Sequence, residues 1–182
     1  MILRLDAGDR NDFIYFPALL FGMEHGDNRI LQRYVERRYN QFNGAYGSGI
    51  SAMRQASGAT PGRYVRIRRE GKIALLGNGM NTPDIYAGWH DVDLGDDFRS
   101  LFRCELPTLF VSGTFDSNTP ISNVEELLPS FSKAQHLVVD NAGHEDILPN
   151  AEVQQEIIRF FRKEISIKKS VALPKPRFVP FF

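Results

Sequence analysis

Two β-prone runs joined by a segment of helix length constrain the fold of this chain more than any other feature. Residues 108–112 form an uninterrupted apolar run, as expected for a strand covered on both faces, and residues 136–140 form a second run. Between them, residues 121–131 carry apolar side chains at helical spacing, and Asn150 is placed to cap a further helix. Two strands joined by such a helix form a βαβ unit of a parallel sheet. The sequence therefore predicts an α/β fold.

The segment before these strands has a different pattern. It predicts helices over residues 12–23 and 27–39, a helix from 61 to 71 or onward to 76, and a loop over 77–97. Asp27 and Thr60 are the expected N-caps. We expect three regions: a mainly helical one over 1–104, an α/β segment over 105–165, and a basic, proline-containing tail over 166–182 that is extended or forms an additional arm.

Composition narrows the class of protein. The chain has 182 residues, of which 42% are hydrophobic and 24% charged, as is typical of globular rather than disordered proteins. Its 22 basic and 22 acidic residues balance, which argues against nucleic acid or an anionic membrane as the main partner. No apolar run approaches the roughly 20 residues of a membrane span, and the first ten residues do not have the pattern of a signal peptide. Nothing in the sequence indicates a compartment. The single cysteine, Cys104, excludes an internal disulfide, lacks zinc-site spacing, and is expected to lie partly buried before a strand.

One titratable side chain follows each predicted strand. Asp116 comes just after Gly113 and Thr114, and His144 follows Ala142 and Gly143, small residues that allow a sharp turn. Each has an ordinary explanation alone, as a turn aspartate or a loop histidine. In open α/β sheets, however, reactive groups gather at the carboxyl ends of the strands. There an aspartate can orient a histidine that acts as a general base, so the pair indicates two members of a serine-hydrolase triad.

These motifs resemble the C-terminal part of α/β-hydrolase peptidases, in particular the proline iminopeptidase and tripeptidyl aminopeptidase group. The resemblance extends over roughly residues 50–165. It rests on residues 112–120, Asn123, Glu125, 134–139 and 142–144, and upstream on 56–60, 66–70, 75–77 and 93–98.

The resemblance implies an acid role for Asp116 and a base role for His144, with no metal or organic cofactor. It implies a peptide or small acyl substrate, and it implies that helical residues 10–76 are part of a cap over the active site. Aminopeptidases of this group often hold the substrate amine with cap carboxylates. Candidates are available, but no motif selects among them: Glu24, Glu36 and Glu70.

The nucleophile of the resembled family is missing from the sequence. That family carries its serine in a G-x-S-x-G turn between a strand and a helix, and the sequence contains no such pentapeptide. Ser51 has Gly49 two positions before it but Met53 two positions after, and no β-prone run precedes it. We therefore expect the C-terminal portion of a serine hydrolase, an aminopeptidase by resemblance, which supplies Asp116 and His144 but not the serine. Its partner would be the missing N-terminal half, and the chain alone would be inactive.

Two alternatives remain open at this stage. A non-catalytic, partner-binding module or pseudo-enzyme would also lack the serine, although it would have no need to keep both Asp116 and His144. An esterase on the same fold would use the same pair, because fold does not determine the chemistry. The exposed edge of a two-stranded sheet also predicts self-association of the isolated chain.

Overall fold

The computed structural model describes residues 13–43, 53, 56–73, 93–164 and 167–181. The chain divides into two compact units, one formed by residues 40–102 and the other by residues 2–39 together with 103–182. The first helices therefore group with the C-terminal strands. The three regions expected over 1–104, 105–165 and 166–182, and the role of the first as a cap, stay predictions.

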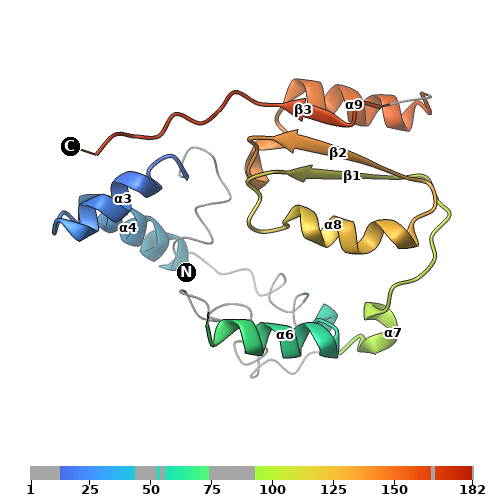
Figure 1. The fold of residues 1–182 in the computed structure, drawn as a ribbon, viewed down its shortest axis with the longest axis horizontal. Coiled ribbons are helices and arrows are strands. Elements are labelled where there is room, and N and C mark those ends of the chain that lie inside the picture. The colour runs from blue at the N-terminus through green and yellow to red at the C-terminus, as the bar shows by residue number, and fades with distance from the viewer. Residues whose placement is uncertain (1–12, 44–52, 54–55, 74–92, 165–166, 182) are drawn as a thin grey trace. The chain divides into compact units, whose positions relative to one another are not determined.

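The larger unit contains a parallel sheet and most of the helices (Figure 1). Its elements are α3 (Phe16–Glu24), the start of α4 (Arg29–Asn43), β1 (Thr108–Gly113), α8 (Ile121–Leu127), η2 (Leu128–Ser130), β2 (Ala134–Asp140), η3 (His144–Asp146), α9 (Ala151–Phe161) and β3 (Ser170–Ala172). The other unit contains α6 (Pro61–Gly71) and α7 (Gly95–Arg99). No helix in the described residues is long and apolar enough to cross a membrane.

The sheet has three strands in the order β1-β2-β3, and both neighbouring pairs are parallel. Both predicted strands and the α/β class are confirmed. The third strand was not predicted: it lies within the segment expected to be an extended tail or arm over residues 166–182, where Val171 pairs opposite Val139. Residues 173–181 continue beyond it without further helix or strand. β3 was missed because it is only three residues long and only Val171 in it is buried, so it shows no strand periodicity.

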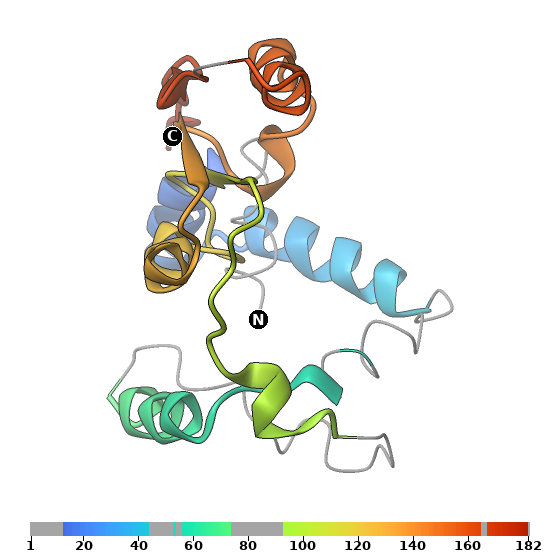
Figure 2. The ribbon, with the colours of Figure 1, turned by 90° about the vertical axis from the view of Figure 1, so that its right-hand side faces the viewer.

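The two faces of the sheet are covered by different helices. Leu137 and Val139 are fully buried in a cluster with Val153 of α9. Alternate residues point to the other face, where Phe110 of β1 packs edge-on against Phe131 at a ring-centroid separation of 5.2 Å and α8 contacts β1. The two helices therefore cover different sides of the strands (Figure 2). This double cover explains the continuous apolar run in β1.

A buried glutamate fixes the start of β3. Glu156 of α9 is 3% exposed, and its carboxylate accepts a hydrogen bond from the backbone N–H of Lys168 at 2.8 Å and another from Arg159 at 3.1 Å. The Lys168 N–H, with help from Arg159 and against the opposing effect of burial, lowers the pKa of Glu156 below its usual range. The ionised carboxylate thus holds the segment that leads into β3 against α9.

The helix boundaries show which local signals were sufficient. Thr60 caps α6 by accepting from Arg63 N–H at 3.4 Å, and Asn150 caps α9 by accepting from Val153 N–H at 3.0 Å, as predicted. α6 ends at Gly71, and the predicted continuation to residue 76 lies outside the described residues beyond 73.

Other boundaries differ from the predictions. α4 begins at Arg29, because Asp27 accepts the Arg29 N–H at 3.1 Å from outside the helix. α3 begins at Phe16, which places Pro17 in the first turn, where its missing N–H costs nothing. The predicted helix over 121–131 leaves α geometry at Leu128, where Pro129 interrupts the backbone donors and a 3₁₀ turn follows.

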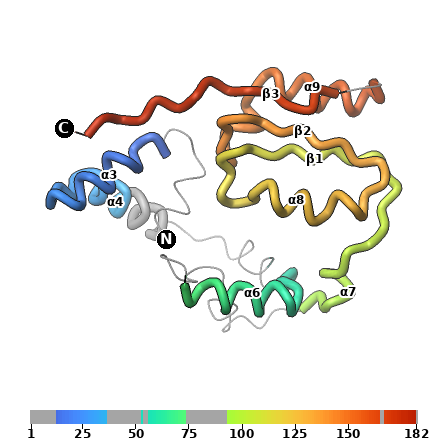
Figure 3. Tube along the Cα trace, in the orientation of Figure 1, coloured from blue at the N-terminus to red at the C-terminus, as the bar shows by residue number. Residues whose placement is uncertain are grey.

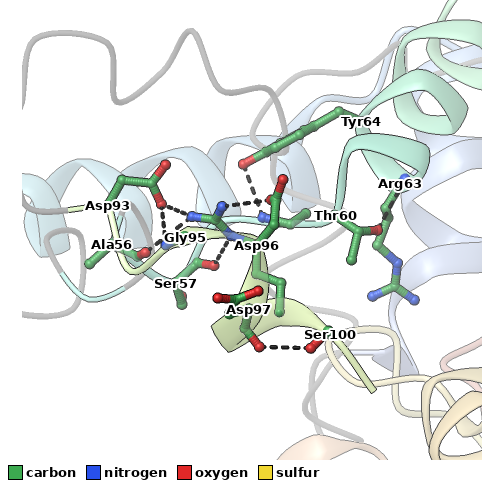
Figure 4. Close-up of polar contacts among 12 residues, drawn as sticks. Ala56, Ser57, Thr60, Arg63, Tyr64, Asp93, Gly95, Asp96, Asp97 and Ser100 are labelled. Atoms are coloured by element: carbon green, nitrogen blue, oxygen red, sulfur yellow. Dashed lines mark hydrogen bonds and ion pairs between the residues drawn. The ribbon is translucent and has the colours of Figure 1, made fainter. Parts of the chain in front are cut away.

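A single arginine organises the described part of the smaller unit. The Arg99 guanidinium donates to the Ser57 carbonyl at 2.7 Å and the Ala56 carbonyl at 3.4 Å, and it also pairs with Asp93 and Asp96. Figure 4 labels these four partners. Its side chain is only 11% exposed. α7 corrects the loop predicted over residues 77–97, whose part up to 92 lies outside the described residues. It is a five-residue helix held by this arginine, a tertiary contact that local patterns do not reveal.

Candidate active site

The loops that follow β1 and β2 are joined to each other by hydrogen bonds. Thr114 N–H donates to the Val139 carbonyl at 3.0 Å, and Phe115 N–H donates to the Ala142 carbonyl at 2.9 Å. In return, Asn141 N–H donates to the Thr114 hydroxyl at 2.8 Å. These bonds continue the parallel ladder past the strand ends, so the residues that follow emerge at the same edge of the sheet.

Gly113 permits this close approach. A Cβ atom at this position would clash with the Ala142 carbonyl oxygen and lie 3.0 Å from the carbonyl carbon. It would also lie 3.3 Å from Ile147, a buried residue of the core. Any larger residue must therefore separate the two loops.

The sharp turn after β2 occurs at Asn141 rather than at the glycine. Asn141 has φ of 58°, in the left-handed region that Asn tolerates better than most residues, whereas Gly143 has φ of −86°. The Asn141 side chain donates from Nδ2 to the Leu173 carbonyl at 2.8 Å, which ties the turn to the residue after β3. Gly143 N–H donates to the Asp146 carboxylate at 2.8 Å and so fixes the 3₁₀ turn that carries His144.

The structure brings the two predicted residues into direct contact. Nδ1 of His144 lies 2.8 Å from Oδ2 of Asp116, and the Asp116 side chain is 2% exposed. The other carboxylate oxygen, Oδ1, accepts the backbone N–H groups of Asn118 and Thr119 at 2.8 and 2.9 Å. The Thr119 hydroxyl donates to Oδ2 at 2.7 Å. Each of these hydrogen bonds to Asp116 favours its ionised form.

The environment of Asp116 sets its charge. Burial alone would raise its pKa, but the backbone and hydroxyl donors of Thr119, together with His144, outweigh burial and lower the pKa below its ordinary value. A buried carboxylate that stays ionised is the partner that an imidazolium requires.

The His144 ring is oriented to accept a proton. Because the ionised Asp116 can only accept, Nδ1 of His144 must carry the hydrogen, which leaves Nε2 with a lone pair. The side chain is 40% exposed, and no partner of Nε2 is found in the described part of the chain. The arrangement can take a proton at Nε2 while Asp116 stabilises the positive charge that results.

Thr119 is the residue of this site that sequence reasoning missed. Its hydroxyl oxygen also lies 3.3 Å from Nδ1 of His144, so it touches both members of the pair. The signal was present as a threonine three residues after an aspartate in a turn, a spacing at which side chain and backbone commonly bond.

A second hydrogen-bonded pair that contains a histidine lies within β1 and β2, before the ends of the strands. Nε2 of His136 in β2 lies 3.0 Å from the hydroxyl of Ser112 in β1, which is 2% exposed. Burial lowers the pKa of His136 below its usual range, and the nearby charge of Glu125 opposes that effect. Because Ser112 is buried within the sheet and bonded to His136 rather than to His144, it does not serve as the nucleophile of the exposed pair.

In the described part of the chain, the cysteine and the three glutamates considered from the sequence make no hydrogen bond or ion pair with Asp116 or His144. Cys104 is buried, and its backbone pairs with the segment before β2 through Ser130 and Ser132. Among the described residues, no cluster of three or more His, Cys, Asp or Glu side chains could hold a metal ion. Of the three carboxylates considered as amine-binding candidates, Glu24 lines an apolar pocket beside α3, and Glu36 accepts a hydrogen bond from Gln32 at 2.7 Å on α4. Glu70 pairs with Arg66 on α6.

A parallel βαβ sheet with an aspartate and a histidine joined at its carboxyl edge is the arrangement of an α/β-hydrolase domain. Residues 90–165, which include both strands and both residues, match the family model described as TAP-like protein. No curated protein and no solved structure matches the chain. The match and the sheet together support a hydrolase of the α/β-hydrolase superfamily.

Proposed function

We propose that Asp116 and His144 are the acid and the general base of a serine hydrolase. The observation that carries this proposal is the 2.8 Å contact between a buried, ionised carboxylate and a partly exposed imidazole. Thr119 joins them as a positioning residue, because it bonds to the carboxylate and not to the outward Nε2.

In this mechanism His144 moves one proton in each half of the reaction. A serine hydroxyl attacks the acyl carbon of the substrate, and Nε2 of His144 takes its proton. As the bond to the leaving group breaks, the imidazolium gives that proton to the leaving group. Water then repeats the sequence on the acyl-enzyme and releases the acid, while Asp116 remains ionised throughout.

We propose that the serine comes from outside these 182 residues. The absence of a G-x-S-x-G pentapeptide and the burial of Ser112 support this. The place of β1 also supports it, since β1 ends the strand order and pairs only with β2 in the described residues. A strand of the complementary part of the hydrolase would pair along its free edge, and a second copy could occupy that edge in the isolated chain.

We further propose a peptide substrate cleaved from its N-terminus. This preference rests on the resemblance to tripeptidyl aminopeptidases and on the match to a TAP-like family model. An esterase would use the same pair, so a panel of aminoacyl-naphthylamides against simple esters separates the two chemistries on the complete enzyme.

The deciding experiment compares two histidine variants in the complete enzyme. We expect His144→Ala to lower kcat by about 10⁶-fold, as loss of a triad base does. The matched control is His136→Gln, which removes the histidine within β2 and should leave kcat nearly unchanged in folded protein. Equal losses in both variants would contradict the role of His144. The 182-residue chain itself should resist labelling by a fluorophosphonate, and serine-specific labelling would contradict an external nucleophile.

A further inference from the structure

An apolar pocket lies beside α3 in the same unit as the parallel sheet. It has a volume of about 400 Å³, within the range of pockets that hold small ligands. Its lining is aromatic or aliphatic except for a single carboxylate: Phe13, Phe16, Pro17, Leu20, Phe21, Glu24 and Phe178. Phe178 comes from the far end of the sequence, so the pocket requires a tertiary contact.

That contact is made by residues 173–181, which we call the arm. Its first residue is anchored at the turn before His144, where Leu173 N–H donates to the Asp140 carbonyl at 2.9 Å and the Leu173 carbonyl accepts from Asn141. The arm then runs in extended form to α3 (Figure 3), where Val179 N–H donates to the Ile14 carbonyl at 3.0 Å. The arm thus connects the histidine loop to the start of α3.

Aromatic contacts connect the same region to the aspartate loop. The Phe178 ring packs against Phe13 with centroids 5.4 Å apart, and Phe13 packs against Phe115 at 5.3 Å. Phe115 immediately precedes Asp116. The wall of the pocket is therefore continuous with the loop that carries the proposed catalytic acid, and the arm contributes that wall.

The charge of the pocket limits what can enter it. Glu24 is the one charged residue in the lining, so a ligand with a negative charge would meet a carboxylate of like charge beside apolar walls. An uncharged apolar group meets no such cost and gains from burial against the Phe rings.

We propose that this pocket is the subsite for an uncharged apolar side chain of the substrate, and that Phe178 is its specificity-determining residue. That the ligand is a substrate rests on the proposed hydrolase function, but binding to the pocket can be tested without catalysis. The arm acts as a strap: its Val179 bond to Ile14 holds Phe178 in place over Phe13.

The test measures binding of two fluorescent probes to the 182-residue chain. N-phenyl-1-naphthylamine is neutral and apolar, and 1-anilinonaphthalene-8-sulfonate carries the same ring system with a negative charge. We expect the neutral probe to bind more tightly, and Glu24→Gln to reduce the difference between them. We expect Phe178→Ala to weaken the neutral probe by about tenfold, which corresponds to about 1.4 kcal/mol.

Phe161→Ala is the matched control, because Phe161 is 76% exposed on α9 and does not line the pocket. It should bind the neutral probe as the unaltered chain does. Phe178→Leu keeps an apolar wall, so its affinity for the neutral probe should lie between those of Phe178→Ala and the unaltered chain. This variant also provides a test if Phe178→Ala fails to fold. Equal affinity of folded Phe178→Leu and Phe161→Ala, or tighter binding of the sulfonate, overturns the proposal.

Kinetics of the complete enzyme distinguish the two proposals. If both hold, Phe178→Ala raises KM for substrates with large apolar side chains more than it raises KM for alanine substrates. An unchanged KM for the large substrates overturns the subsite. Full activity of His144→Ala overturns the proposed function alone, because the probe measurement does not depend on it.

Discussion

One histidine lies within β2 and another lies just after it, and the two have opposite surroundings. His136 is within β2, partly buried, and bonded to the hydroxyl of Ser112. His144 follows the end of that strand, is 40% exposed, and is bonded to the buried carboxylate of Asp116. Both pairs link β1 or the loop after it to β2 or the loop after it, but only the pair past the strand ends combines a charged partner with exposure to solvent. Position along a parallel sheet, as well as residue type, is therefore the basis on which we assign the proposed chemistry to His144.

Substitution of Gly113 should have the largest effect on stability and should affect the two histidine contacts differently. Gly113→Ala places a Cβ against the Ala142 carbonyl and should destabilise the chain by about 3 kcal/mol, in the range for backbone clashes in packed sites. The contact between Asp116 and His144 should be lost before that between Ser112 and His136. Urea unfolding and histidine NMR signals measure the two effects.

Gly62→Ala is the control for this substitution. Gly62 lies in α6, and no heavy atom lies within 4 Å of the position that a Cβ would take there. Alanine should therefore stabilise that helix by up to about 1 kcal/mol. If both variants behave alike, close approach at Gly113 does not hold the site together.

Ser112→Ala tests the buried pair. It removes the partner of a partly buried histidine nitrogen and should cost about 2 kcal/mol, the penalty for leaving a buried polar group unsatisfied. The Asp116 to His144 contact should survive, because each pair is held by its own hydrogen bonds. Loss of the His144 signal in the Ser112→Ala spectrum would show that the pairs are coupled.

Asn141→Gly should have a smaller effect. Glycine keeps the left-handed backbone at this turn, so only the side-chain bond to Leu173 is lost, with an expected cost of about 1 kcal/mol. Asn141→Ala adds backbone strain and should cost more. An equal cost for both variants would mean that φ of 58° at this turn is not a constraint.

Acid should weaken the two pairs in different pH windows. The pKa of His136 is lowered from 6.5, so its neutral form is favoured by folding, and stability falls as the pH drops from 6.5 through the folded value. The pKa of Asp116 is lowered from 3.8, so its contribution is complete above 3.8 and is lost as the pH falls through the folded value. The pKa of Glu156 is lowered from 4.5, so its contribution is lost in a similar acidic range.

Unfolding curves measured across pH for each variant isolate the contribution of each titrating group to the free energy of unfolding. Asp116→Asn should flatten the dependence of the unfolding free energy on pH below 3.8, and His136→Gln should flatten it below 6.5. An unchanged slope in either variant would contradict the corresponding assignment.

The sequence predicted those elements that are determined by a local residue pattern alone. The runs at 108–112 and 136–140, and the caps Thr60 and Asn150, behaved as their residue types predict. β3 and α7 were missed because each depends on a distant partner, the ladder of β2 for one and Arg99 for the other.

The site followed the same rule. Asp116 and His144 could be predicted because parallel strands bring their carboxyl ends to one edge. Thr119, the turn at Asn141 and the aromatic wall from Phe178 could not, because they depend on side-chain directions and on a segment that follows the sheet.

The tautomer of His144 is the decisive measurement of its proposed role as a general base. In a ¹⁵N–¹H spectrum of the neutral imidazole, we expect a protonated Nδ1 and an unprotonated Nε2, because Nδ1 faces the carboxylate of Asp116, which can only accept. Asp116→Asn should abolish this preference, while Ser112→Ala should leave it intact. A neutral His144 that carries its proton on Nε2 in the unaltered chain would contradict its assignment as the general base.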